Sequence, residues 1–370
     1  MHFRSGGQKT HLPKSMTYRV IPCTLGALLL IEESNIFLLV LLLLKCTATK
    51  AAATAYVDGM GTVHDIIAAK GRQATLAHDF DREVVEAAAA YMSDEDAGLR
   101  FLYSGWCQAA LPHRRLPDSK GWQVDGDRYC LIVEPGMRRG PSGEPMHIGV
   151  PFGSRARLIL IYLQSEALRT SSREVLLGKS LRDWMERMNI PVGGKNLAAV
   201  REQTERISRC RLTFEVRQGN RIGLSNQNIM DSAIFLEPDA DDAQGSLFAQ
   251  TAKLSEAFYD GLRRHPVPIE EGAIRAISNN SMAIDIYVWL AYRLHSLSKP
   301  TPLSWRALKT QFGSGFAAMN NFRRNFVPNL ELALAVYPDG RVELDEAGHG
   351  LVLHPSKPPV ATKNISALLG

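Results

Sequence analysis

Basic side chains gather on a helix that the sequence predicts over residues 196–208. Its inward face is formed by residues that recur at three- and four-residue steps, namely Leu197, Val200, Thr204 and Ile207. Outward-facing arginine and lysine side chains can bind DNA phosphates, and arginine also pairs with the guanine edge. Glu202 and Glu205 share the polar side, so this surface is not uniformly cationic. The candidate DNA-binding residues here are Lys195, Arg201 (at the edge of the buried stripe), Arg206 and Arg209.

A second predicted helix, residues 316–326, carries amide as well as basic side chains. Its inward face is predicted to consist of Phe316, Met319, Phe322 and Phe326. Asn320, Asn321 and Arg324 then face outward, and asparagine and arginine are the side chains that read adenine and guanine in the major groove. Arg323 lies nearer the buried side and suits a backbone phosphate. Arg341, at the start of the hairpin that follows, completes the candidate DNA-binding set.

The sequence contains no recognisable reaction centre. Gly193-Gly194-Lys195 lacks the upstream glycine and the following Ser or Thr of a phosphate-binding loop, and no GxSxG or HExxH motif occurs. The aspartates at 239, 241 and 242 lack the spacing of a calcium loop. The five cysteines include no CxxC pair, which argues against zinc and favours a reducing cytoplasm. We therefore expect no enzymatic activity, no metal, no cofactor and no small-molecule substrate.

Composition predicts a folded protein with a modest positive charge. The 370 residues are 45% hydrophobic and 22% charged, which is enough to build real cores, and the length suggests about two domains. The formal net charge of +5 permits a nucleic-acid partner without requiring one. A solvated outer face is the alternative interpretation of either basic helix taken alone.

The order of predicted elements suggests an α+β fold with tandem winged-helix domains. The first domain is predicted at 146–237, with a helix capped by Ser154, a short strand, a helix capped by Ser180, the helix at 196–208 and a hairpin at 211–224. An acidic spacer, Glu237–Gly245, separates it from a second domain at 246–356 with a similar order. There Ser304 caps a helix at 305–312, and a hairpin at 341–353 closes the domain.

The segments that flank these domains are predicted to contain fewer regular elements. Residues 60–145 should hold a helix at 77–91, an extended stretch at 99–111 and a hairpin at 122–133, and should lead into the first domain. The Gly- and Pro-rich stretch 135–151 is predicted to be a loop. Pro328 is predicted to end its helix at 326–327. Residues 357–370 should form a loose tail.

Residues 1–59 do not match the rest of the chain. Two apolar runs, at 20–31 and 36–44, are separated by Glu32-Glu33-Ser34-Asn35, and neither reaches the roughly 20 residues of a spanning helix. A weak membrane anchor, an unusual extension and an upstream translation artefact remain open, and the artefact is favoured because Met60 resembles a natural start. We expect this N-terminal extension to be poorly ordered.

The stretches at 148–214 (beginning IGVPFGSRARLILIYLQSEALR) and 254–313 (beginning LSEAFYDGLRR) closely resemble plasmid replication initiators of the RepA type. The resemblance extends over about residues 60–359. It implies a pair of winged-helix domains that bind repeated sites, called iterons, in double-stranded plasmid origin DNA and help to open the origin. It also implies recruitment of the host replication initiator and replicative helicase, and dimers that repress their own gene in equilibrium with monomers that act at iterons.

Two other functions are compatible with parts of the sequence. A winged-helix transcriptional regulator would share the fold and the basic helices, but one winged domain normally suffices for that role, so the tandem arrangement favours the initiator. A plasmid DNA nickase or primase would need a catalytic constellation, and none is visible in the sequence.

Overall fold

The computed structural model describes residues 18–20, 30–32, 60–78, 80–95, 98–126, 129–218, 221–236 and 248–361. The chain divides into two compact units, residues 1–56 and 57–370. In the first, strands β1 (Tyr18–Val20) and β2 (Leu30–Glu32) pair in antiparallel fashion. The other expectations for residues 1–59 lie outside the described residues. No helix in the described ranges is both long and apolar enough to cross a membrane. The architecture below belongs to the second unit.

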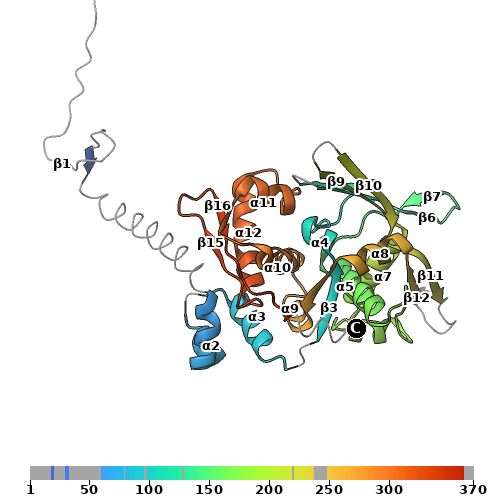
Figure 1. Ribbon diagram of the computed structural model, residues 1–370, viewed down its shortest axis with the longest axis horizontal. Coiled ribbons are helices and arrows are strands. Elements are labelled where there is room, and N and C mark those ends of the chain that lie inside the picture. Colours follow the sequence, from blue (N-terminus) through green and yellow to red (C-terminus); the bar gives the residue numbers. More distant parts are fainter. Residues whose placement is uncertain are drawn as a thin grey trace, which may run out of the picture. The chain divides into compact units, whose positions relative to one another are not determined.

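Two similar sets of elements make up most of the second unit (Figure 1). The first, here called the first module, consists of α5 (Gly153–Arg169), β8 (Glu174–Leu176), α6 (Leu181–Arg187), α7 (Gly194–Arg209), β11 (Met230–Leu236) and β12 (Phe248–Leu254). Its strands form an antiparallel sheet in the order β11-β12-β8. The strand between the first two helices therefore pairs with the last strand of the module.

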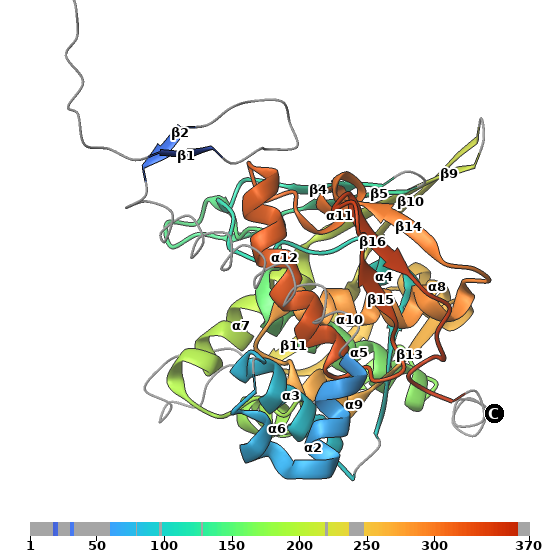
Figure 2. The same cartoon turned by 90° about the vertical axis from the view of Figure 1, so that its left-hand side faces the viewer.

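The second module has the same connectivity. It consists of α10 (Ser281–Arg293), β14 (Thr301–Ser304), α11 (Trp305–Phe312), α12 (Met319–Leu334), β15 (Val342–Leu344) and β16 (Gly350–Leu353). Its sheet has the order β14-β16-β15, so β14 again pairs with the final strand. Figure 2 shows α12 running across the molecule, with β15 and β16 beside it. The chain thus uses one helix-strand-helix-helix-hairpin order twice.

The hairpin of the first module is not the one that the sequence suggested. Strands β9 (Arg211–Gln218) and β10 (Arg221–Asn228) do pair, but they join β4 (Trp122–Asp125) and β5 (Tyr129–Glu134) in a separate sheet of order β10-β9-β5-β4. The module's own hairpin is β11–β12. The spacer expected at 237–245 therefore lies between two paired strands, and its own residues are outside the described part of the chain.

Residues 60–147 contact both modules rather than leading only into the first. This region contains α2 (Met60–Thr75), α3 (Arg82–Met92), β3 (Leu99–Tyr103), α4 (Ser104–Gln108), and the hairpin of β6 (Met137–Arg139) and β7 (Pro145–His147). Strand β3 pairs with β13 (Pro266–Glu270), between α8 (Glu256–Arg264) and α9 (Glu271–Ala276), whereas β5 pairs with β9. The extended stretch expected at 99–111 is wrong beyond Tyr103, and the predicted loop at 135–151 contains the β6–β7 hairpin.

Two of the three predicted serine caps are confirmed. Ser180 Oγ accepts from the backbone N–H of Asp183, and Ser304 Oγ accepts from that of Ala307. The cap predicted at Ser154 is wrong, because Ser154 lies inside α5. The helix begins at Gly153, where φ is +72°. Glycine adopts this left-handed conformation without steric cost, which allows the sharp entry into α5.

The predicted break at Pro328 is also wrong, since α12 continues to Leu334 with the proline inside it. Proline removes the hydrogen bond that its own N–H would donate, and its ring crowds the carbonyl four residues earlier. Phe326 before it and Leu330 after it are 0% and 2% exposed, so the helix is held in the core on both sides. Tertiary packing outweighs the local preference of the proline.

The segment after the second module is ordered against the fold over its described residues. Tyr337 donates its hydroxyl hydrogen to the carbonyl of Lys357 at 2.6 Å, and Val360 is 3% exposed. The loose tail predicted from residue 357 is therefore wrong up to about Val360, because an apolar side chain and a carbonyl bind the segment to the core. Residues 362–370 lie outside the described ranges.

Candidate nucleic-acid interface

The exposed face of α12 carries the side chains that the sequence placed there. Phe322 and Phe326 are fully buried and pack against the ring of Trp305 at centroid distances of 6.4 and 6.0 Å. This packing fixes the rotation of α12, so Asn320, Asn321 and Arg324 are exposed. Arg324 Nη2 donates to Asn321 Oδ1 at 3.4 Å, so the two groups present donors and acceptors side by side. The predicted exposure of Asn320, Asn321 and Arg324 is confirmed, whereas the helix begins at Met319 rather than at residue 316.

Arg323 lies at the border between this exposed face and the core. Its guanidinium carbon is 5.0 Å from the centre of the Trp305 ring, a geometry that favours a cation over an aromatic face. Among the described residues, its buried Nε has no hydrogen-bond partner. The stacking limits the freedom of the guanidinium, which suits a contact with a backbone phosphate beside α12.

Trp305 also holds the turn of the β15–β16 hairpin beside α12. Its indole Nε1 donates to the carbonyl of Gly348 at 3.1 Å, and its backbone N–H donates to the carbonyl of His349 at 3.0 Å. The turn is acidic in part, because Asp345 and Glu346 lie in it. Arg341 lies at the opposite end of the hairpin, where its backbone N–H donates to Ser356 Oγ and its side chain is exposed.

Arg206 of α7 is buried, which corrects its predicted place on the outer face. The residue is 2% exposed, and its guanidinium donates to the Val150 carbonyl, to Asp118 at 3.0 Å and to Glu202 at 2.9 Å. A side chain at Gly149, where φ is +81°, would collide with this guanidinium. Arg206 cannot reach DNA in this arrangement. A helical wheel of α7 alone could not show that residues 112–118 and 148–152 cover this side.

The remaining candidates on α7 differ in accessibility. Lys195 is exposed near the N-terminus of the helix, and Arg201 is half-buried. Arg209 is exposed, but its Nη1 donates to the Met137 carbonyl at 3.3 Å and its Nε lies 3.7 Å from Glu205. The β6–β7 hairpin thus covers part of the C-terminal end of α7, leaving the N-terminal end freer.

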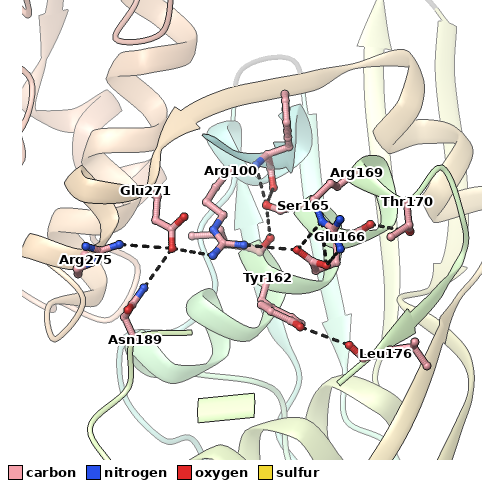
Figure 3. Close-up of polar contacts among 12 residues, drawn as sticks. Arg100, Tyr162, Ser165, Glu166, Arg169, Thr170, Leu176, Asn189, Glu271 and Arg275 are labelled. Atoms are coloured by element: carbon pink, nitrogen blue, oxygen red, sulfur yellow. Dashed lines mark hydrogen bonds and ion pairs between the residues drawn. The ribbon is translucent and has the colours of Figure 1, made fainter. Parts of the chain in front are cut away.

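A polar junction joins α5 of the first module to α9, which precedes the second (Figure 3). Arg100 on β3 lies 2.7 Å from Glu271 on α9 and 3.7 Å from Glu166 on α5. The same Glu271 oxygen accepts from Asn189 Nδ2 at 3.1 Å and lies 3.7 Å from Arg275. These partly buried charges satisfy one another, so we regard the junction as structural.

A second contact between the modules is an ion pair in the core. Arg157 on α5 donates from Nε and Nη2 to the two carboxylate oxygens of Asp285 on α10, at 2.6 Å each. Arg157 Nη2 also donates to the carbonyl of Leu111, at 2.7 Å. Burial raises the pKa of Asp285, and the guanidinium of Arg157 opposes this rise.

His113 lies against this pair. Its Nδ1 is 3.4 Å from Arg157 Nη2 and 3.1 Å from the hydroxyl oxygen of Ser281. Burial, with the charge of Arg157, lowers the pKa of His113 to about 3. The imidazole is therefore neutral near pH 7. Sequence reasoning missed this cluster, because its clearest signal was a single aspartate, Asp285, inside an apolar helical stretch.

The distribution of ion pairs differs between the two modules. In the first, most arginines near α5, α6 and α7 have carboxylate partners, as Arg157, Arg169, Arg187 and Arg206 do. Over residues 281–361, no arginine or lysine lies within 4.0 Å of a carboxylate oxygen of a described residue. The basic residues of this segment are Arg293, Lys299, Arg306, Lys309, Arg323, Arg324, Arg341 and Lys357. Among the described residues, ion-paired basic side chains are therefore more frequent in the first module than in the second.

Fold and site together define a mixed α+β protein with two modules of equal connectivity. One of them presents a basic helix, α12, whose arginines form no ion pair with a described residue. Residues 150–305 match the family model described as "Plasmid encoded RepA protein". This match confirms, over those residues, the resemblance to RepA-type plasmid replication initiators.

Two crystal structures of domains 2 and 3 of RctB are similar in structure to the chain. One, of the selenomethionine derivative, has 11% identity and a TM-score of 0.45, covering 70% of this chain and 99% of that one. The other has 10% identity and a TM-score of 0.40, covering 67% and 94%. The comparison with curated proteins found no match.

Proposed function

We propose that the protein is a plasmid replication initiator that binds repeated sites in double-stranded origin DNA through two winged-helix domains. The connectivity of the two modules supports this fold, because each has three helices, a strand paired with the final strand, and a closing hairpin. The match of residues 150–305 to plasmid-encoded RepA proteins supports the role. Binding opens the origin and recruits the host initiator and helicase, and a dimer in equilibrium with the monomer represses the protein's own gene.

The observation that carries this proposal is the exposed face of α12. Asn320, Asn321 and Arg324 project from a helix whose other face is locked in the core, beside the hairpin that Trp305 holds in place. Asparagine reads adenine and arginine reads guanine by paired hydrogen bonds in the major groove. The second module therefore supplies most of the base recognition, and the first supplies backbone contacts through Lys195 and Arg209 or takes part in dimerisation.

The protein acts, in this proposal, without a catalytic centre or cofactor of its own. DNA binding should therefore proceed without ATP or a divalent metal. Steady ATP hydrolysis by the pure protein that is lost with a single substitution would contradict this part of the proposal.

A footprint on the DNA that flanks the gene tests the proposed function. An initiator should protect several evenly spaced direct repeats, whereas a winged-helix transcriptional regulator should protect one operator. Protection of a single site with no repeats nearby would favour the regulator. Uniform protection at every position, with no preferred site, would contradict both.

A further inference from the structure

A cleft lies between the second module and the facing ends of β4 and β5. It has a volume of about 620 Å³ and is bounded by α11, the C-terminal end of α10, β14 and the turn at Gly126. The side chains that matter to its chemistry are Gln108, Tyr129, Tyr292, Arg293, Arg306 and Thr310. It is separate from the exposed face of α12, whose residues do not line it.

The described lining of the cleft carries positive charge. Arg293 and Arg306 are exposed, and neither forms an ion pair or side-chain hydrogen bond with any described residue. No aspartate or glutamate is among its described lining residues. A second cleft, beside Glu271 at the polar junction, differs in charge, because Glu186 and Glu271 line it together with Arg187 and Arg275. Two unpaired guanidinium groups in one cleft favour an anionic occupant.

The position of the cleft points to the nature of that anion. Arg306 lies in the first turn of α11, and α11 leads directly into α12. When two helices in this order bind DNA, the second enters the major groove and the first crosses the sugar-phosphate backbone. A phosphate that approaches α11 would therefore belong to the same duplex that α12 reads.

We propose that this cleft binds the phosphodiester backbone of the duplex flanking the sequence that α12 reads. Arg293 and Arg306 contact phosphate oxygens there, and the hydroxyls of Tyr292 and Thr310 line the same path. The inference rests on the proposed function. It adds a contact outside the base-reading surface. Gly126 and Tyr129, at the facing ends of β4 and β5, form one wall of the cleft.

The test compares the full chain with the double variant Arg293→Gln/Arg306→Gln. Arg82→Gln is the matched control, because Arg82 is an arginine with 81% side-chain exposure on α3, outside both modules. Binding to the recognised duplex is measured at several salt concentrations. Two DNA lengths are used, one with flanks and one shortened by roughly 10 bp, or one helical turn, on each side. Thermal unfolding confirms that each variant is folded.

On the flanked duplex, the slope of log K against log salt should become shallower by about 2 in the double variant, because each lost phosphate contact removes about 0.9. The preference for the recognised sequence over a scrambled one should not change. On the shortened duplex, the double variant and the parent should have equal slopes. Arg82→Gln should match the parent on both.

If the slope of log K against log salt on the flanked duplex is unchanged in the double variant, this inference is overturned, even if the parent distinguishes the recognised from the scrambled duplex. Loss of binding to a single-stranded oligonucleotide alone, with duplex binding intact, would overturn it as well and assign the cleft to a single strand. A parent chain that fails to distinguish the recognised from the scrambled duplex would instead contradict the proposed function.

Discussion

Arg157 and Asp285 form a bidentate ion pair in the core, with both donor–acceptor distances at 2.6 Å. The pair joins α5 to α10, the first helices of the two modules. Because Arg157 also binds the carbonyls of Leu111 and Pro112, one guanidinium connects three segments that are distant in the sequence. The relative position of α7 and α12 therefore depends on a polar contact that touches neither helix.

Removing one partner of this pair should be costly. Asp285→Ala leaves the Arg157 charge buried and unpaired, and we expect a loss of about 3–5 kcal/mol in the free energy of unfolding. The double variant Arg157→Met/Asp285→Leu should recover part of this loss but not all of it, since the carbonyls of Leu111 and Pro112 also lose a donor. Chemical denaturation measures both. An equal loss in both variants would show that the unpaired charge is not the main cost.

His113 should make the fold sensitive to mild acid. Its pKa is about 3 in the folded protein, against 6.5 for an ordinary histidine. Between these values the unfolded chain binds one more proton than the folded chain, so stability falls as pH decreases, by about 1.4 kcal/mol per pH unit. Denaturation at pH 6.5 and pH 4.5 should show a loss of about 2–3 kcal/mol that His113→Gln lacks. Equal pH dependence in both proteins would contradict this assignment.

Pro328 should be a local weak point of α12. The residue is exposed, so Pro328→Ala removes little packing, and it restores the N–H that can donate to the carbonyl of Arg324. We expect the free energy of unfolding to rise by about 1–3 kcal/mol. Urea denaturation measures the change. A decrease in stability would show that the proline ring contributes packing that outweighs the missing hydrogen bond.

The sequence predicts local elements well where their signals are local. The caps at Ser180 and Ser304 and the outward face of Asn321 and Arg324 follow from residue type and helical period. The pairing of β11 with β12 could not be predicted, because the acidic segment between them resembles a linker and β12 has little β-branched character. Arg206 was misplaced because its cover comes from Asp118 and Val150, which are distant in sequence.

In the proposed function, α12 reads bases whereas the first module contacts the backbone. Arg324→Ala and Arg209→Ala separate these two roles, since each removes one exposed arginine from the third helix of its module. Affinity is measured on the recognised and on a scrambled duplex, at several salt concentrations. Arg324→Ala should reduce the free energy of binding by about 1–3 kcal/mol on the recognised duplex and by much less on the scrambled one. Arg209→Ala should weaken both nearly equally, with a salt slope shallower by about 1. Loss of discrimination in Arg209→Ala, with discrimination intact in Arg324→Ala, would contradict the claim.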